Sequence, residues 1–281
     1  MENKKTPKFV IALALVIVFI FSFLLFNIVS VFYGKIQCNR MIDAIRNDDI
    51  NKLELILHFS NPNCVNESLI KAVGSERYRY TPLGEACKAG NFEMVKLLVE
   101  DGADVNYAPI LTDTSPLGFA SENDSADNLK IVKFLIEKGA DVDFSKYKHA
   151  HPGFRLLAKE NLSPNGMEIL EELLKAGSDP NKERLLQVAC INKHEEVIRY
   201  LVEEWGYDAS DPRNLCGYCY GGREYSYETF EYFLERGANP YEKYLANKFK
   251  GEKNAIEYLQ EKSPEWAEKL IELAASYGIT E

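Results

Sequence analysis

The fold is decided by the stretch Thr81-Pro-Leu-Gly-Glu-Ala-Cys87, Gly90-Asn-Phe-Glu-Met-Val-Lys-Leu-Leu-Val99 and Gly102-Ala-Asp-Val-Asn106. Thr81 is suited to cap a helix, because its hydroxyl can accept a hydrogen bond from an amide of the first turn, and Pro82 suits the first helical position. Val95, Leu98 and Val99 then follow the i, i+3, i+4 spacing that lines one face of a second helix. The stretch therefore predicts two short helices with glycine turns after each.

The same pattern of an apolar triplet followed by a glycine turn recurs towards the C-terminus. The turn glycines fall at 102, 139, 177, 206 and 237, so their spacings are 37, 38, 29 and 31 residues. These stretches resemble ankyrin repeats, whose period is about 33 residues. The resemblance implies an all-α solenoid of stacked helix pairs, with partners bound along the concave groove formed by first helices and hairpin loops.

The copies depart from the ankyrin pattern in identifiable ways. Gly84 and Gly118 stand where the family usually has His, and the second copy carries three extra residues between its helices. Later first helices are expected around Phe154, Leu185 and Leu215, without a Thr-Pro-Leu start. Degenerate pairs at both ends are interpreted as caps, as expected where one face meets water. Residues 40–281 are thus predicted to form about six repeats.

An uncharged apolar stretch precedes the repeats. We expect a tail at residues 1–8, a transmembrane helix at 9–33 and a linker at 34–39. A 25-residue helix is about 37 Å long, enough to cross a hydrocarbon core of roughly 30 Å. A cleavable signal peptide is the alternative, but its apolar region should be only 7–15 residues and end in a small-x-small site. The length therefore favours a single-pass anchor.

The charge distribution bears on orientation and partners. Lys4, Lys5 and Lys8 flank one end of the span, and Lys35 and Arg40 flank the other. The count favours a cytoplasmic N-terminus with the repeats outside the cytoplasm, although the opposite orientation stays open. The chain has a formal net charge of −10. This argues against nucleic acid or an anionic lipid surface as a partner of the repeats, since both are bound through Lys and Arg.

The six cysteines have different expected roles. Cys87 and Cys190 occupy an apolar slot and are interpreted as small buried hydrophobes. Cys216 and Cys219 form a Cys-x-x-Cys motif, and Cys38 and Cys64 flank the first helix pair. Outside the cytoplasm we expect each of these two pairs to form a disulfide. No metal site or cofactor is predicted, because the further zinc ligands are lacking.

Aromatic side chains are the main binding signal. Tyr107, Phe144, Tyr147 and Tyr241 follow the glycine turns, in the expected hairpin loops. Tyr218 and Tyr220 lie in a polar, glycine-rich segment. Tyrosine is enriched at protein interfaces because it combines contact area with a polar tip. These six residues are the candidate contacts, with packing between adjacent loops as the alternative.

The resulting functional hypothesis is a membrane-anchored, non-enzymatic protein-binding module. A narrower version is an immunity or inhibitor protein that neutralises a toxin or hydrolase at the membrane, for which an acidic domain would suit a basic partner. A different class, thiol oxidoreductase, would rest on Cys216 and Cys219 alone. That interpretation expects a thioredoxin-like βαβ context, which the sequence lacks.

Overall fold

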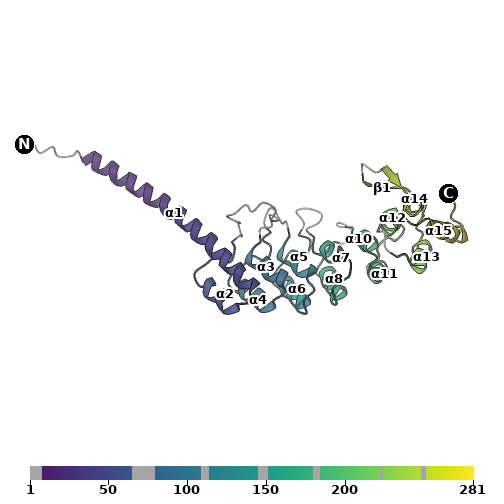
Figure 1. Ribbon diagram of the computed structural model, residues 1–281, viewed down its shortest axis with the longest axis horizontal. Coiled ribbons are helices and arrows are strands. Elements are labelled where there is room, and N and C mark those ends of the chain that lie inside the picture. The colour runs from purple at the N-terminus through teal and green to yellow at the C-terminus, as the bar shows by residue number, and fades with distance from the viewer. Residues whose placement is uncertain are drawn as a thin grey trace, which may run out of the picture.

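A computed structural model describes residues 8–64, 80–108, 114–144, 151–179, 184–221, 224–247 and 251–281. Within these ranges the secondary structure is almost entirely helical (Figure 1). The elements are α1 (Lys8–Arg46), α2 (Ile50–Leu57), α3 (Pro82–Ala89), α4 (Phe92–Glu100), α5 (Pro116–Glu122), α6 (Asn128–Glu137), α7 (Pro152–Leu157), α8 (Gly166–Lys175), α10 (Leu185–Asn192), α11 (Glu195–Glu203), α12 (Pro212–Tyr220), α13 (Tyr227–Glu235), β1 (Tyr244–Asn247), β2 (Gly251–Lys253), α14 (Ala255–Lys262) and α15 (Pro264–Ser276).

The helix pairs stack into a two-layered solenoid. Figure 1 shows the first helices α3, α5, α7, α10 and α12 in one layer and the second helices α4, α6, α8, α11 and α13 in the other. One cluster of buried apolar side chains runs through the stack from Met41 to Ala274. The predicted all-α solenoid is confirmed. Neighbouring pairs share this core, so no described pair has to bury its apolar face alone.

Capping residues fix where the first helices begin. The Thr81 hydroxyl accepts a hydrogen bond from the Gly84 amide (2.9 Å), and Ser115 does the same for Gly118 (3.1 Å). α7 and α12 also begin at a proline, after His151 and Asp211. The expected starts near Phe154 and Leu215 are therefore two to three residues late. The cap chemistry persists although Thr is replaced, because any side-chain acceptor can serve the first turn.

Glycine turns end the helices as predicted. Gly90 closes α3 with φ of 70°, in the left-handed region that glycine adopts without strain. The five turn glycines that follow α4, α6, α8, α11 and α13 also have positive φ. The longer turn of the next copy is confirmed too, since α5 and α6 are separated by residues 123–127 and α3 and α4 only by 90–91.

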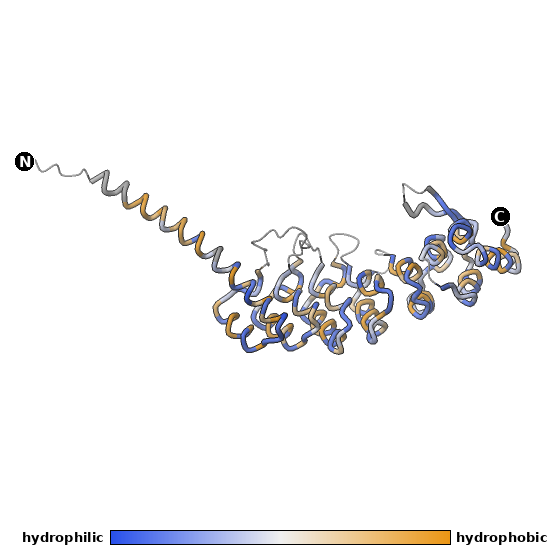
Figure 2. Tube along the Cα trace, viewed as in Figure 1, coloured by the Kyte–Doolittle hydropathy of each residue, from blue (hydrophilic) through white to orange (hydrophobic). Residues whose placement is uncertain are grey.

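Helix α1 is continuous from the apolar stretch into the first helix pair. Residues 34–39, expected to be a linker, are helical, and Gly34 costs a helix only about 1 kcal/mol relative to Ala. Figure 2 shows α1 projecting from the solenoid, with mostly hydrophobic residues along the part of the helix that is coloured. Its most apolar window has a mean hydropathy of 2.8 and none of it is buried by the described chain. By length and composition this helix can cross a membrane.

The short hairpin β1–β2 departs from the all-helical expectation. The two strands pair antiparallel, with Tyr244 opposite Lys253. Asn254 follows directly and caps α14 in a reciprocal arrangement with Glu257. The hairpin therefore sits where another repeat would have its hairpin loop, and it leads the chain into the closing pair α14 and α15.

Candidate binding site

Asparagine side chains connect successive hairpin loops. Asn63 donates to the Gly102 carbonyl (2.9 Å) and accepts from the Asp104 amide (2.7 Å). Asn106 repeats this with the Gly139 carbonyl (3.0 Å) and with the amide two residues further on (2.7 Å). Each side chain thus uses both its donor and its acceptor on the next loop. These bonds set the spacing of the loops and of the side chains they display.

Asp143 occupies the position in the next hairpin loop that corresponds to Asn63 and Asn106, and it makes different hydrogen bonds. A carboxylate cannot donate, and Asp143 instead accepts from the Asp179 amide (3.0 Å) and bonds His151 Nε2 (3.1 Å). His151 Nδ1 accepts from the Gly153 amide (3.1 Å), so the ring proton lies on Nε2 and is donated to Asp143. Burial raises the pKa of Asp143, but the bonds from His151 and the Asp179 amide outweigh it and hold that pKa below its usual value.

The loops after α4 and α6 together form a shallow hollow, which we call the acidic-aromatic hollow. Tyr107 is 40% exposed there, and Phe144 is half-buried. Three carboxylates accompany these rings. The hollow is lined by Asp104, Asn106, Tyr107, Ala108, Asp141, Asp143 and Phe144. An aromatic surface ringed by acids suits a flat apolar or cationic group on a partner.

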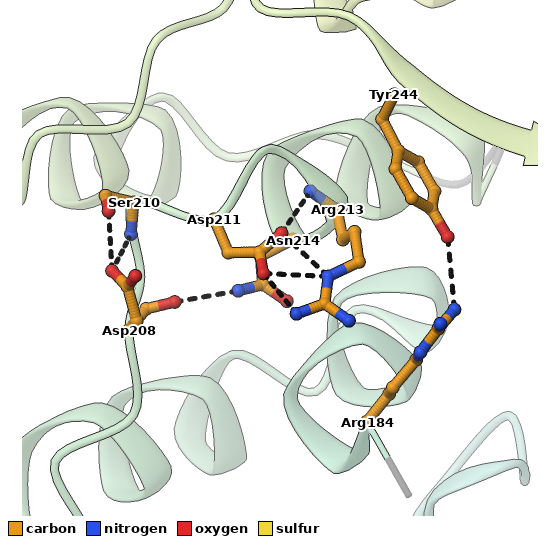
Figure 3. Close-up of polar contacts among 7 residues, drawn as sticks. All are labelled: Arg184, Asp208, Ser210, Asp211, Arg213, Asn214 and Tyr244. Carbon is orange, nitrogen blue, oxygen red and sulfur yellow. Dashed lines mark hydrogen bonds and ion pairs between the residues drawn. The ribbon is translucent and has the colours of Figure 1, made fainter. Parts of the chain in front are cut away.

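A second depression lies between α10, the loop after α11 and the start of α12 (Figure 3). Asp211 caps α12 through the Arg213 amide (2.9 Å) and holds the Arg213 guanidinium with both oxygens. Arg184 bonds the hydroxyl of Tyr244 (3.2 Å). The volume of about 200 Å³ is below the roughly 300 Å³ at which small-molecule pockets begin. It suits a single side chain of a partner better than a free ligand.

Residues 41–146 match the family model of ankyrin repeats, in three copies. The chain contains ankyrin repeats. The match runs from the end of α1 to the hairpin after α6, and the later pairs continue the same stack. No curated protein matches the chain. Ankyrin repeats are protein-interaction modules, and their stacked loops and first helices form an extended concave surface.

The ankyrin architecture brings only some of the predicted contacts together. Tyr107 and Phe144 share the acidic-aromatic hollow. Tyr241 lies at the other end of the solenoid, partly buried against the core. Tyr220, the last residue of α12, is exposed and packs on Tyr258, with 5.7 Å between the ring centroids. Tyr147 lies outside the residues that the structure describes.

Tyr218 is not a surface residue. Its side chain is fully buried, its hydroxyl donates to Glu195 (2.8 Å), and the Ser226 amide donates to it (3.0 Å). The ring meets Phe230 edge to face at 5.4 Å. The expectation that Tyr218 contacts a partner is wrong. Pro212–Tyr220 of this segment form helix α12, and Tyr218 lies on the face of α12 that packs into the core of the solenoid.

Lys193 fills an unusual position beside this aromatic cluster. It ends α10 with φ of 61°, the conformation that Gly90 adopts in the earlier copy. Its ammonium lies 3.6 Å from the ring centroids of both Tyr218 and Tyr225 and has no hydrogen-bond partner among the described residues. Burial lowers the pKa of Lys193 to about 7, although Cys219 and Glu195 oppose that shift. The two rings take the place of water around the cation.

We expect stability to rise with pH from about 7 to about 10.5 because of Lys193. In that window the unfolded chain keeps a proton that the folded chain releases, since the amine's ordinary pKa is 10.5. The slope should approach about 1.4 kcal/mol per pH unit at most. Lys193→Met should flatten the slope and raise the melting temperature at pH 6.5. A variant with the parent's slope would assign the pH dependence to other groups.

The structure confirms only part of the disulfide pairing that the sequence predicts. Cys38 and Cys64 form a disulfide, with 5.8 Å between their Cα atoms. Cys216 and Cys219 are free and buried on α12, which differs from the expected bridge. The Cys216 thiol donates to the Lys253 carbonyl (3.8 Å). Cys87 and Cys190 are buried and free, as predicted.

Thiol oxidoreductase chemistry finds no support in this arrangement. Burial raises the pKa of Cys216 to about 12, and that of Cys219 well above its usual value. Reactive Cys-x-x-Cys thiols have a lowered pKa and an accessible sulfur, because the thiolate is the nucleophile. Both thiols lie in the solenoid core and behave there as apolar side chains.

Proposed function

We propose that this chain is a non-enzymatic ankyrin-repeat module, held at a membrane, that binds a protein partner carrying a basic segment. The observation that supports this most is the convergence of Tyr107 and Phe144 with three carboxylates in one hollow between two stacked hairpin loops. The acidic charge of the whole chain would steer such a partner towards it. The partner's aliphatic or guanidinium groups would pack on the two rings, and its positive charges would lie next to the three carboxylates.

Truncating the two rings should weaken partner binding. The carboxylates are poor sites for substitution, because Asp104 and Asp141 also accept hydrogen bonds from backbone amides of their own turns (2.9 and 3.0 Å). We expect Tyr107→Ala with Phe144→Ala to raise Kd about ten- to a hundredfold once the partner has been captured with the intact membrane complex. Tyr277→Ala is the matched control, since Tyr277 is equally exposed, at 40%, at the far end of the chain. Equal affinities for parent and double variant would place the binding site elsewhere.

The membrane part of the proposal rests on α1. Its exposed apolar half is long enough to span a bilayer and leads without a break into the first repeat. The apolar stretch ends in Val31-Phe-Tyr-Gly-Lys35, which lacks the small-x-small site of a cleavable signal. We therefore infer an uncleaved single-pass anchor with the repeats outside the cytoplasm. The Cys38–Cys64 disulfide supports that side, since such bonds persist in oxidising compartments.

Alkylation in intact cells tests this topology. Cys38 and Cys64 should resist a thiol reagent until a reductant is added, and peptide mapping should recover them as one cross-linked pair. The free cysteines serve as the control, because unfolding alone should expose them to the reagent. Alkylation of Cys38 and Cys64 without reductant would favour the cytoplasmic orientation.

A further inference from the structure

The first repeat exposes apolar side chains of a kind that the other described repeats keep inside. Leu55 is 62% exposed and Phe59 is 73% exposed. Beyond α1, the described residues include one further exposed large aliphatic side chain, Ile50, and it belongs to the same repeat. The exposed aromatics of the later described repeats are Tyr and Trp, which carry a polar group. The apolar exposure is therefore concentrated at the end of the solenoid next to α1.

Leu55 and Phe59 lie on one face, because they are four residues apart and the helical turn of α2 continues through Phe59. The Phe59 amide donates to the Ile56 carbonyl (3.1 Å), which fixes that turn. The opposite side of α2 carries the buried Leu53 and Leu57. The Leu55 and Phe59 pair thus faces away from the solenoid, and we call it the free face of the first repeat.

The position of this face relative to the span follows from the continuity of α1. Cys38 lies five residues beyond Tyr33, so the two are about 7.5 Å apart along the helix. The disulfide ties Cys64, five residues after Phe59, to that level of α1. The headgroup layer on each side of the hydrocarbon core is about 5–7 Å thick. In Figure 1 α2 lies at the end of the solenoid from which α1 projects.

We propose that the free face of the first repeat, Leu55 with Phe59, docks into the headgroup region of the bilayer that α1 spans. This rests on the proposed membrane anchor. The contact is apolar and not electrostatic, because Asp48, Asp49 and Glu54 offset the basic residues of the same repeat. It would hold the solenoid at a fixed angle to the membrane. A second copy of the chain is the competing occupant.

Tryptophan quenching in vesicles of brominated phosphatidylcholine tests the docking with the full chain. The brominated lipid should quench a larger fraction of the tryptophan fluorescence in Phe59→Trp than in the parent. It should not do so in Tyr277→Trp, whose new indole lies at the far end of the chain. Phe19→Trp, in the apolar half of α1, is the control for the anchor and should be quenched strongly. Adding Leu55→Glu to Phe59→Trp should abolish most of the quenching of the indole introduced on the free face, without releasing the protein from vesicles.

The outcomes separate the two proposals. If Phe19→Trp is quenched and Phe59→Trp is not, the anchor stands and the docking is wrong. If Phe19→Trp is unquenched and alkaline carbonate strips the protein from the vesicles, the anchor itself fails. A third outcome would overturn lipid docking and assign the free face to a second copy of the chain. In that case the indole of Phe59→Trp is quenched neither by the brominated lipid nor by iodide in solution, and chains cross-link to one another.

Discussion

Gly90→Ala is expected to lower the free energy of unfolding by about 3 kcal/mol or more. Two costs add at this position. The left-handed conformation, with φ of 70°, costs a residue with a Cβ roughly 1–2 kcal/mol. The new methyl would also overlap Ser125 Oγ and lie 2.7 Å from Asn123 Oδ1, so the turn after α5 must move. Urea unfolding of the protein in detergent, followed by circular dichroism, measures the loss.

Gly102→Ala separates the two costs. Gly102 also has positive φ, at 93°, but no atom of the described chain lies within 4 Å of the position of its Cβ. It should therefore lose only the conformational part, about 1–2 kcal/mol. Adding Ser125→Gly to Gly90→Ala should recover part of the difference by removing the nearest atoms. Equal losses for Gly90→Ala and Gly102→Ala would show that the turn yields without cost.

His151→Ala is expected to cost about 2–4 kcal/mol. The ring is fully buried, and its two nitrogens serve different parts of the structure. Nδ1 caps α7, and loss of such a cap costs roughly 1 kcal/mol. Nε2 bonds Asp143 and lies 3.4 Å from the Ser178 hydroxyl, and unsatisfied buried groups cost about 1–3 kcal/mol. The melting temperature and the urea midpoint should both fall.

His151→Ser is the matched variant, because Ser115 caps the equivalent helix α5. It should recover the cap alone and be more stable than His151→Ala by about 1 kcal/mol. The remaining deficit measures the bond to Asp143. If His151→Ser and His151→Ala are equally stable, the cap contributes nothing and the loss lies entirely in the link to the next hairpin loop.

Local rules of backbone chemistry predict much of the fold from the sequence. Thr81, Pro82 and Gly90 fix helix ends through their own backbone chemistry, so the helices between them are predicted correctly. The starts of α7 and α12 escape prediction because His151 and Asp211 stand where the repeat pattern has Thr. The continuity of α1 escapes it because Gly34 suggests a break, whereas a single exposed glycine is tolerated in a long helix.

The binding surface is harder to predict because burial depends on partners distant in the sequence. Tyr107 and Phe144 are 37 residues apart and meet only through the stacking of two hairpins. Tyr218 and Tyr107 are both tyrosines, but only Tyr107 is exposed. Tyr218 is buried in the core, where its hydroxyl bonds Glu195 and the Ser226 amide. The depression around Arg184 and Arg213 belongs to no motif. The proline after Asp211 is the one local signal that points to it.

The unbroken course of α1 sets the direction in which the solenoid offers its groove. Figure 1 shows the layer of first helices on the side towards which α1 rises. With the apolar half of α1 in a bilayer, the solenoid would extend away from the membrane and that layer would face obliquely back towards it, since the helix continues without a hinge through the described residues that join the two parts. The groove then opens into a wedge of space bounded by lipid. In that arrangement, a partner that itself diffuses within the membrane would enter this wedge by lateral motion, at a far higher effective concentration than one arriving from solution.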